Sequence, residues 1–192
     1  MRLDPEQVQE IIDRTLRLVS EQITAMEGTC QPLGSDRVMA VFGWPRATDN
    51  DPERAILTAL RIQAAMGRMS LPRAARSGQL AAKIGIASGR IFTGTGTLGG
   101  GPMLIGEAVH CATELQQAAP AGAIVVGREI YRRVEGAFQV ERLPPSGEAP
   151  TSEAYRIVGL APFRRDSVPT DFHGAPTRLI GRAAEIQRLV DA

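Results

Sequence analysis

Apolar residues recur at helical spacing in two stretches of the N-terminal third of the chain. The first stretch opens at Asp4-Pro5, where Asp4 is a helix cap, Pro5 suits the first helical position and Gln7 completes a capping box. Its apolar face consists of Val8, Ile11, Ile12, Thr15, Val19, Ile23 and Met26. Gly28 is the expected C-terminal cap. The second stretch opens at Asp51-Pro52-Glu53 and continues through Ile56, Leu60, Gln63 and Met66. Both patterns predict amphipathic helices.

Short apolar runs bounded by glycine, proline and aspartate predict strands between and after these helices. The expected strands are Thr29–Leu33, Arg37–Phe42, Leu80–Ser88, Arg90–Thr95, Met103–Ile105, Ala123–Val126, Phe138–Leu143 and Ala154–Val158. Gly89 joins the third strand to the fourth, and the last two strands form a hairpin. Two further helices are expected over 106–119 and 129–135. This order predicts an α+β fold with a mixed or antiparallel sheet, not a doubly wound parallel one.

Composition narrows the class of protein. The 192 residues are 43% hydrophobic, and 22 basic residues nearly balance 21 acidic ones. No overall field therefore favours nucleic acid or an anionic membrane. No apolar run reaches the roughly 18 residues that a spanning helix needs. The two cysteines, Cys30 and Cys111, lack the spacing of a metal site or a disulfide framework, which indicates a reducing, cytoplasmic setting.

The chain divides into three parts. Residues 1–160 contain the predicted helices and strands, and 161–177 form a linker with three prolines and little periodicity. Residues 178–192 follow as a terminal helix. The stretch TRLIGRAAEIQRLVDA resembles the opening of an AAA-like regulatory ATPase module, and an ordinary amphipathic helix explains it equally well.

Four motifs in order carry a second resemblance. They are DRVMAVFG (36–43), DPERA (51–55), KIGIASG (83–89) and IGEAVHCATEL (105–115). Together they resemble the class III adenylate/guanylate cyclase catalytic domain over about residues 3–158. The resemblance implies a ferredoxin-like α+β core whose first strand, normally in the middle of the sheet, is missing ahead of Leu3. Its absence is expected to expose an apolar edge and unpaired backbone groups.

The resemblance also implies a chemistry. In that family, two Mg²⁺ or Mn²⁺ ions held by two aspartates help a 3′-hydroxyl attack the α-phosphorus of a nucleoside triphosphate. A lysine and a second polar residue select the base, an asparagine orients the ribose, and an arginine stabilises the phosphorus in the transition state. The site forms between two protomers, so a homodimer or a heterodimer with another cyclase-type domain is expected.

Little of this equipment is present in the chain. Asp36 matches the second metal ligand, whereas Pro32 replaces the lysine and Met103 stands at the other base-reading position. His110 takes the asparagine position and Glu114 the arginine position. A carboxylate beside a triphosphate adds a repulsion of about 4 kcal/mol per unit pair at ~4 Å and an effective dielectric of 20. That energy corresponds to roughly a thousandfold in rate.

Simpler roles stand beside these assignments. Asp36 also suits a tight turn. His110, with no carboxylate or second histidine at ligand spacing, is expected to pack partly buried. The run Gly94–Gly99 fits G-x-G-x-x-G but precedes a strand, so it is a hairpin tip and not a dinucleotide site.

Three functions remain open at this point. The first is a catalytically degenerate cyclase-like domain in intracellular signal transduction, which dimerises and regulates an attached C-terminal ATPase. The second is an active adenylate cyclase that makes cAMP and diphosphate from ATP with a partner chain completing the site. The third is a sensor that binds ATP without turnover.

Overall fold

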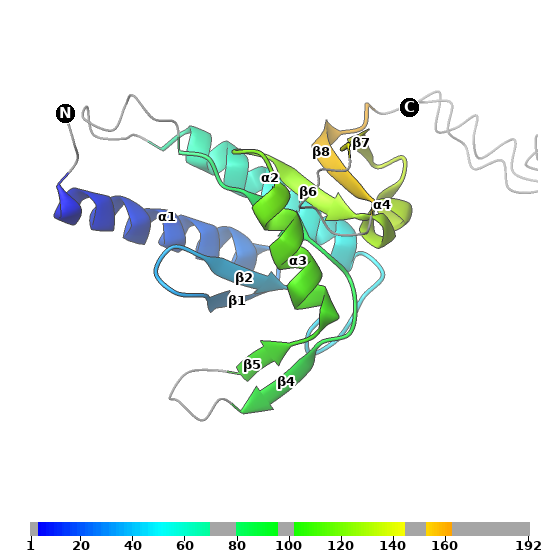
Figure 1. Cartoon of the computed structure of the whole chain (residues 1–192), viewed down its shortest axis with the longest axis horizontal. Helices are drawn as coiled ribbons and strands as arrows, with labels where there is room; N and C mark the ends of the chain where they lie inside the picture. The colour runs from blue at the N-terminus through cyan, green and yellow to red at the C-terminus, as the bar shows by residue number, and fades with distance from the viewer. Residues whose placement is uncertain (1–3, 70–79, 96–101, 145–152, 163–192) are drawn as a thin grey trace, which may run out of the picture. The chain divides into compact units, whose positions relative to one another are not determined.

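The computed structural model describes residues 4–69, 80–95, 102–144 and 153–162 (Figure 1). Its helices are α1 (Pro5–Ala25), α2 (Asp51–Gly67), α3 (Glu107–Ala118) and α4 (Arg128–Val134). Its strands are β1 (Thr29–Pro32), β2 (Val38–Val41), β3 (Ile84–Ile86), β4 (Phe92–Thr95), β5 (Pro102–Ile105), β6 (Ile124–Gly127), β7 (Phe138–Arg142) and β8 (Ala154–Leu160). The chain divides into two units, 1–161 and 162–192. From residue 163 on, the expected linker and terminal helix lie outside the described residues.

The largest sheet has the strand order β3-β6-β8-β7. Strand β3 runs parallel to β6, and the other two pairs are antiparallel. The sheet is therefore mixed, and the predicted hairpin of β7 and β8 is confirmed, with Val140 opposite Ile157. Strands β1 and β2 form a separate antiparallel pair, and so do β4 and β5.

Strand β6 is buried on both faces. Ile124 and Val126 join a core cluster with residues of α2 and α4, whereas Val125, 0% exposed, joins a second cluster with Leu115 of α3. Alternate strand residues point to opposite faces, so helices cover both sides of this strand. That coverage explains its uninterrupted apolar run.

A third cluster lies beneath α1. It consists of Ile23 of α1 and Ile62 and Met66 of α2, and we call these three residues the α1/α2 floor. Side chains from separate strands pack on it, namely Cys30 of β1, Val38 of β2 and Ile84 of β3, together with Leu18, Val19, Leu80 and Ala82. No residue of β1 or β2 is fully buried. The N-terminal layer thus shares a floor with the large sheet but is less well covered.

Helix α1 begins as predicted and ends differently. The Asp4 N–H donates to Gln7 Oε1 at 3.3 Å, which is one half of the capping box. At the other end Glu27, not Gly28, has the left-handed conformation, with φ 57°. The Gly28 N–H donates to the Ile23 carbonyl at 2.9 Å. Glycine is needed at 28 for a different reason, because a Cβ there would lie 2.8 Å from the side chains of Ile23 and Phe42.

The expected strands Leu80–Ser88 and Arg90–Thr95 do not pair through Gly89. Only Ile84–Ile86 forms a strand, and it pairs with β6, whereas β4 pairs with β5. Ahead of β3, Gln63 Nε2 donates to the Ala82 carbonyl at 2.7 Å, so a side chain of α2 and not a strand engages this backbone acceptor. None of the helices in the described ranges combines the length and the hydropathy needed to cross a membrane.

Candidate functional site: a β-hairpin and helix α3

Asp36 lies at the tip of the β1–β2 hairpin. The turn is closed by a 2.8 Å hydrogen bond from the Leu33 N–H to the Arg37 carbonyl, and Gly34 supplies a positive φ of 82°. The Asp36 side chain is 70% exposed, and its Oδ1 lies 3.9 Å from Nε of Arg37. The structure therefore places Asp36 in solvent next to a cation.

The described residues do not form a divalent-metal site around Asp36. Mg²⁺ and Mn²⁺ prefer several oxygen ligands in near-octahedral geometry. In the part of the chain that the structure describes, no three His, Cys, Asp or Glu side chains gather closely enough to hold a metal ion. Asp36 brings a single carboxylate with a guanidinium beside it. Its role as a metal ligand stays a prediction.

Pro32 and Met103, the two predicted base-reading positions, lie on different strands. Pro32 ends β1, is exposed and faces Val38 across the hairpin. Residues in direct register alternate between bonded and non-bonded pairs. Since Leu33 and Arg37 are a bonded pair, the position of the missing Pro32 N–H points away from β2. Met103 lies in β5 opposite Gly94 of β4.

His110 and Glu114 contact each other on α3. His110 Nε2 lies 2.9 Å from Glu114 Oε1, across one helical turn. This finding corrects two expectations: His110 has a carboxylate partner, and its side chain is 76% exposed rather than partly buried. The spacing of four residues was the signal that could have revealed the pair. One oxygen of Glu114 is therefore already engaged by a neighbour on its own helix.

Cys111 lies between these two residues on α3 and is half-buried. Burial raises the pKa of its thiol, and the negative charges of Glu107 and Glu114 raise it further. The thiolate is the nucleophilic form of cysteine. At neutral pH the Cys111 thiol stays protonated, so it does not add a reactive group to this helix.

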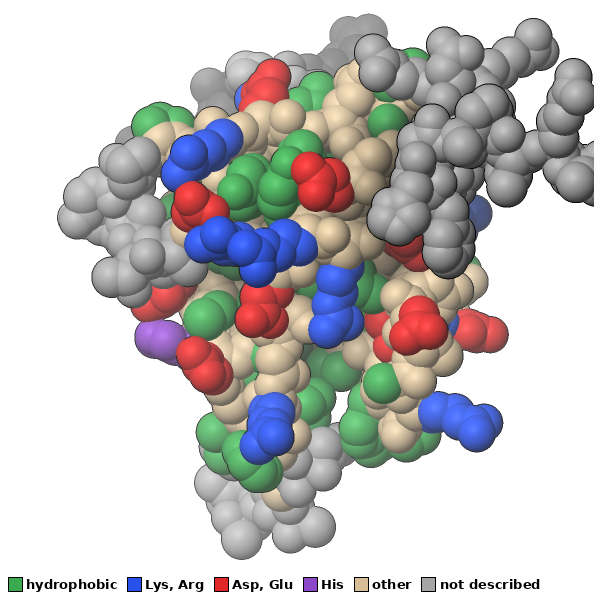
Figure 2. Space-filling view, turned by 90° about the vertical axis from the view of Figure 1, so that its right-hand side faces the viewer, with side chains coloured by type: hydrophobic (Ala, Val, Ile, Leu, Met, Phe, Trp, Pro, Cys, Tyr) green, Lys and Arg blue, Asp and Glu red, His purple; other side chains and the backbone are tan. Residues whose placement is uncertain are grey.

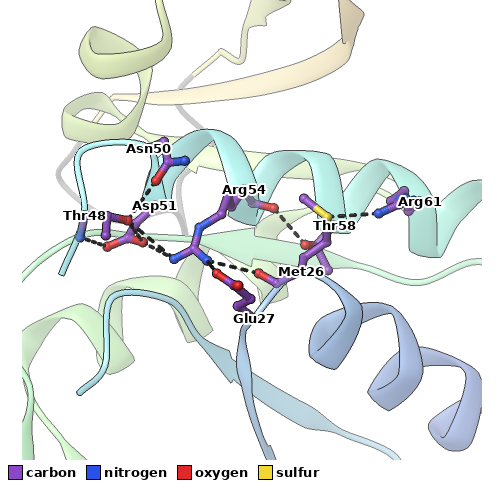
Figure 3. Close-up of polar contacts among 8 residues, drawn as sticks. All are labelled: Met26, Glu27, Thr48, Asn50, Asp51, Arg54, Thr58 and Arg61. Carbon is purple, nitrogen blue, oxygen red and sulfur yellow. Dashed lines mark hydrogen bonds and ion pairs between the residues drawn. The ribbon is translucent and has the colours of Figure 1, made fainter. Parts of the chain in front are cut away.

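Arg54 of α2, which the sequence analysis did not single out, lies at the centre of a polar cluster (Figure 3). Its Nη1 donates to Glu27 Oε2 at 2.9 Å and to the Met26 carbonyl at 3.3 Å. Its Nη2 donates to Asp51 Oδ1 and, at 3.5 Å, to Thr48 Oγ1. Arg54 thus ties the start of α2 to the end of α1. The sequence signal for the contact between Asp51 and Arg54 was their spacing in DPERA (51–55), because residues three apart on a helix are neighbours.

Asp51 completes this cluster. Its Oδ2 accepts from the Thr48 N–H at 2.7 Å, and its Oδ1 accepts from Thr48 Oγ1 at 2.6 Å. Burial raises the pKa of the Asp51 carboxyl, but the hydrogen bonds from Thr48 and Arg54 and the charge of Arg54 outweigh it, so the pKa lies below its ordinary value. Gly43, with φ 83°, leaves room for this carboxylate, because a Cβ there would collide with Oδ2 of Asp51. The role of this cluster is structural.

Charges of both signs are interspersed on the face drawn in Figure 2. Apolar side chains are exposed at its lower end, where β4 and β5 lie in Figure 1. Phe92 is 71% exposed and its cross-strand neighbour Ile105 is 53% exposed. This β4–β5 arm is thus an apolar surface that the described residues do not cover.

Comparison with known proteins identifies the fold. No family model matches the chain, and no curated protein matches it. Solved structures do match. The guanylate cyclase domain of RhGC from Catenaria anguillulae, solved with GTP, superposes with a TM-score of 0.72 at 19% identity, covering 83% of this chain and 87% of that one. The chain has the fold of a class III nucleotide cyclase catalytic domain.

Two further cyclase structures are similar. A non-canonical dimeric guanylyl cyclase domain of the RhoGC fusion protein from Blastocladiella emersonii gives a TM-score of 0.72 at 18% identity, covering 83% of this chain and 87% of that chain. The adenylyl cyclase CyaB from P. aeruginosa gives 0.67 at 20% identity, covering 86% and 87%. The predicted cyclase-type α+β fold is confirmed. On this cyclase fold, the five candidate residues lie on the β1–β2 hairpin, on β5 and on α3.

Proposed function

We propose that this chain is a catalytically degenerate class III cyclase-like domain, which acts in intracellular signal transduction as a dimerising regulatory module. The observation that carries the proposal is the His110–Glu114 pair. It lies where the resemblance expects an asparagine and an arginine. The helix that should bring a cation to a triphosphate instead presents a carboxylate. The proposed location is the cytoplasm.

The charge change works against catalysis in two ways. A carboxylate in place of a guanidinium removes an attraction to the phosphates and adds a repulsion, each worth about 4 kcal/mol at ~4 Å and an effective dielectric of 20. A single such term slows a reaction by roughly a thousandfold. The 2.9 Å contact with His110 does not turn this position into a cation, because a carboxylate still occupies it and only one of its two oxygens is engaged.

The metal half of the site is also weak. Asp36 is exposed and lies beside Arg37, whose positive charge opposes the approach of a divalent cation. A second acidic ligand would have to come from outside the described residues. The proposal is therefore a domain that keeps the cyclase-type fold but lacks most of the metal-binding and phosphate-binding residues.

Dimerisation is the part of the proposal that the β4–β5 arm supports. Phe92 and Ile105 expose apolar side chains next to each other on paired strands. Contiguous exposed apolar surface marks interaction sites. One of the structural neighbours is described as dimeric. We propose a homodimer, or a heterodimer with another cyclase-type domain.

The test is a paired assay of turnover and binding. The 192-residue chain with Mg²⁺ or Mn²⁺ and ATP or GTP should form no cyclic nucleotide above a no-enzyme control, and titration calorimetry should detect no ATP binding below about 1 mM. Glu114→Arg should tighten ATP binding at least about tenfold, whereas Glu141→Arg, an exposed control on β7, should not. Robust turnover by the unmodified chain, or equal effects of both variants, would overturn the proposal.

Residues 178–192 enter the proposal as the start of an AAA-like ATPase module that the cyclase-like domain regulates. These residues lie outside the described ranges, so the support is the sequence resemblance alone. Joining residues 1–177 to a C-terminal ATPase module that begins with residues 178–192 should change the rate of ATP hydrolysis by that module. An identical rate with and without the domain would remove this part of the proposal.

An active adenylate cyclase is the second candidate, and the exposed β4–β5 arm favours it because a partner could complete the site there. It requires Mg²⁺ or Mn²⁺, an upstream aspartate to act with Asp36, and a partner chain that supplies the arginine and the base readers. Mixing the chain with candidate cyclase-type partners should then yield cAMP that Asp36→Ala abolishes. Activity that survives Asp36→Ala would exclude this version.

A further inference from the structure

Two methionine sulfur atoms lie where α1 and α2 meet. Met26, the C-terminal cap of α1, accepts a hydrogen bond from Arg61 of α2, with Nη1 2.9 Å from Sδ (Figure 3). Met69 follows the end of α2, and its Sδ is 3.9 Å from Thr15 Oγ1 of α1. Both methionines are half-buried. Each thioether therefore lies at the end of one helix and contacts a side chain of the other.

The donors beside the two sulfur atoms differ. Arg61 is exposed, and its guanidinium carries several N–H donors on a long side chain that can shift. The Thr15 hydroxyl has a single proton, which it donates to the Ile11 carbonyl at 2.7 Å. Because that proton is engaged, Thr15 has none left for Met69. Met26 thus has a cationic donor beside it, whereas the nearest hydroxyl to Met69 serves another acceptor.

A third methionine on the same pair of helices gives the comparison within the molecule. Met66 belongs to the α1/α2 floor and is 5% exposed. An oxidant dissolved in water must touch a sulfur atom to react with it. Burial therefore protects Met66, and the half-buried Met26 and Met69 are the thioethers of this layer that such an oxidant reaches first.

We infer that Met26 and Met69 are sites of oxidation by hydrogen peroxide, and that the sulfoxide at Met69 loosens α1 whereas the sulfoxide at Met26 does not. One oxygen atom passes from the peroxide to the sulfur as the O–O bond breaks, and the peroxide leaves as water. The sulfur loses two electrons and the peroxide gains two. The product is a polar sulfoxide whose oxygen is a hydrogen-bond acceptor.

The two sulfoxides have different surroundings. At Met26, an N–H group of Arg61 can bind the added oxygen, and a hydrogen bond from a charged donor is a strong one. At Met69, the added oxygen gains a bond from Thr15 only if the bond to Ile11 breaks. A partly buried acceptor without a donor is destabilising. The contact between Met69 and α1 should therefore open on oxidation.

The experiment is peroxide treatment of the 192-residue chain, followed by peptide mass spectrometry and amide hydrogen exchange. Met26 and Met69 should be oxidised at least about fivefold faster than Met66. Exchange of the α1 amides around Thr15 should rise at least about threefold, whereas exchange in α4 should not change. Equal oxidation rates at the three methionines would overturn the inference. So would α1 exchange that stays constant once Met26 and Met69 are oxidised.

Two leucine variants separate the sites, because leucine nearly keeps the volume of methionine and removes the sulfur. Met69→Leu should abolish the effect of peroxide on α1, and Met26→Leu should leave it intact. Cys30, whose Sγ lies 3.0 Å from Ser20 Oγ of α1, is present in both variants, so its own oxidation does not produce a difference between them. A peroxide effect that survives Met69→Leu contradicts the inference.

Arg61→Ala tests the role of the guanidinium. In the Met69→Leu variant, peroxide should leave exchange in the last turn of α1 unchanged. With Arg61→Ala added, the sulfoxide at Met26 loses its donor, and exchange there should rise at least about twofold after peroxide treatment. If the double variant responds no more than Met69→Leu alone, Arg61 does not stabilise the oxidised Met26 and that half of the inference is wrong.

Discussion

The two helices that begin with Asx-Pro signals have very different surroundings. Helix α2, 17 residues long, buries Pro52, Ile56, Thr58, Ala59, Ile62 and Met66. Helix α1 is longer, at 21 residues, and its pattern is at least as amphipathic, yet only Ile23 is buried. The strands differ in the same way, because three of the four residues of β6 are buried and none of β1 or β2 is.

The difference teaches that an amphipathic pattern defines a face but not how completely that face is covered. Helix α2 packs on β6, which has a hydrogen-bonded strand on each side, so little water reaches its apolar face. Helix α1 lies over the two-stranded hairpin of β1 and β2, none of whose residues is fully buried. Burial energy scales with the area removed from water, so we expect the N-terminal layer to contribute less stability per residue than the large sheet.

The largest expected effect compares the same substitution in the two helices. Ile56→Ala in α2 removes a side chain that is 0% exposed and should lower the free energy of unfolding by about 4 kcal/mol. Ile12→Ala in α1 removes a half-buried one and should cost about 1 kcal/mol. Urea unfolding measures both. Equal losses would show that α1 is as tightly packed as α2 in solution.

The second prediction concerns the contact between β3 and α3. A Cβ at Gly85 would overlap the Ala112 carbonyl and the Gln116 N–H of α3, both backbone groups that cannot rotate away. Gly85→Ala should therefore destabilise the chain by about 3 kcal/mol. Gly159→Ala in β8, where nothing lies within 4 Å, is the matched control and should cost less than about 0.5 kcal/mol.

The third prediction concerns Asp51, which binds the Arg54 side chain that ties the start of α2 to the end of α1. Because the pKa of Asp51 is lower in the folded chain than its ordinary value of 3.8, its ionised form stabilises the fold. This contribution is fully present above pH 3.8 and is lost as the pH falls through the folded-state pKa. Asp51→Asn should lower stability by about 1–2 kcal/mol at neutral pH and make the decline toward acid shallower.

The control for that measurement is Asp13→Asn, an exposed carboxylate on α1 that accepts one hydrogen bond from Gln9 at 2.9 Å. Urea unfolding at a series of pH values compares the variants. If the free energy of unfolding of Asp51→Asn fell toward acid pH as steeply as that of the unmodified chain, the assignment of acid sensitivity to this carboxylate would be contradicted.

The smallest expected effect is that of the His110–Glu114 pair. His110 is exposed and Glu114 is half-buried, and a charged pair four residues apart on a helix contributes about 0.3–0.5 kcal/mol. A double-mutant cycle with His110→Ala and Glu114→Ala should give a coupling of that size, and high salt should reduce it. A coupling above about 2 kcal/mol would indicate a more buried pair, nearer to the partly buried His110 that the sequence analysis expected than to the exposed His110 of the structure.

Local chemistry made much of the fold predictable. The starts of α1 and α2, the β1–β2 hairpin, the β7–β8 hairpin and the mixed sheet follow from caps, turn residues and apolar periodicity. For the candidate site, the sequence predicted which positions correspond to functional residues, but not the contacts or the exposure of their side chains. The spacing of four residues could have revealed the contact between His110 and Glu114, which the sequence analysis missed. The exposure of His110 depends on which side of α3 packs on the sheet, and spacing does not determine that side.

By itself, then, the sequence determined the alternation of helices and strands, the turn that holds Asp36 and the charge of residue 114, because each depends on a few neighbouring residues. Only the tertiary structure decided that β3 pairs with β6 rather than with β4, that Arg54 joins two helices, and that β2 and β3 share a floor without pairing. Those features depend on contacts between distant segments, whose free energy is set by the complete packing and not by local preference.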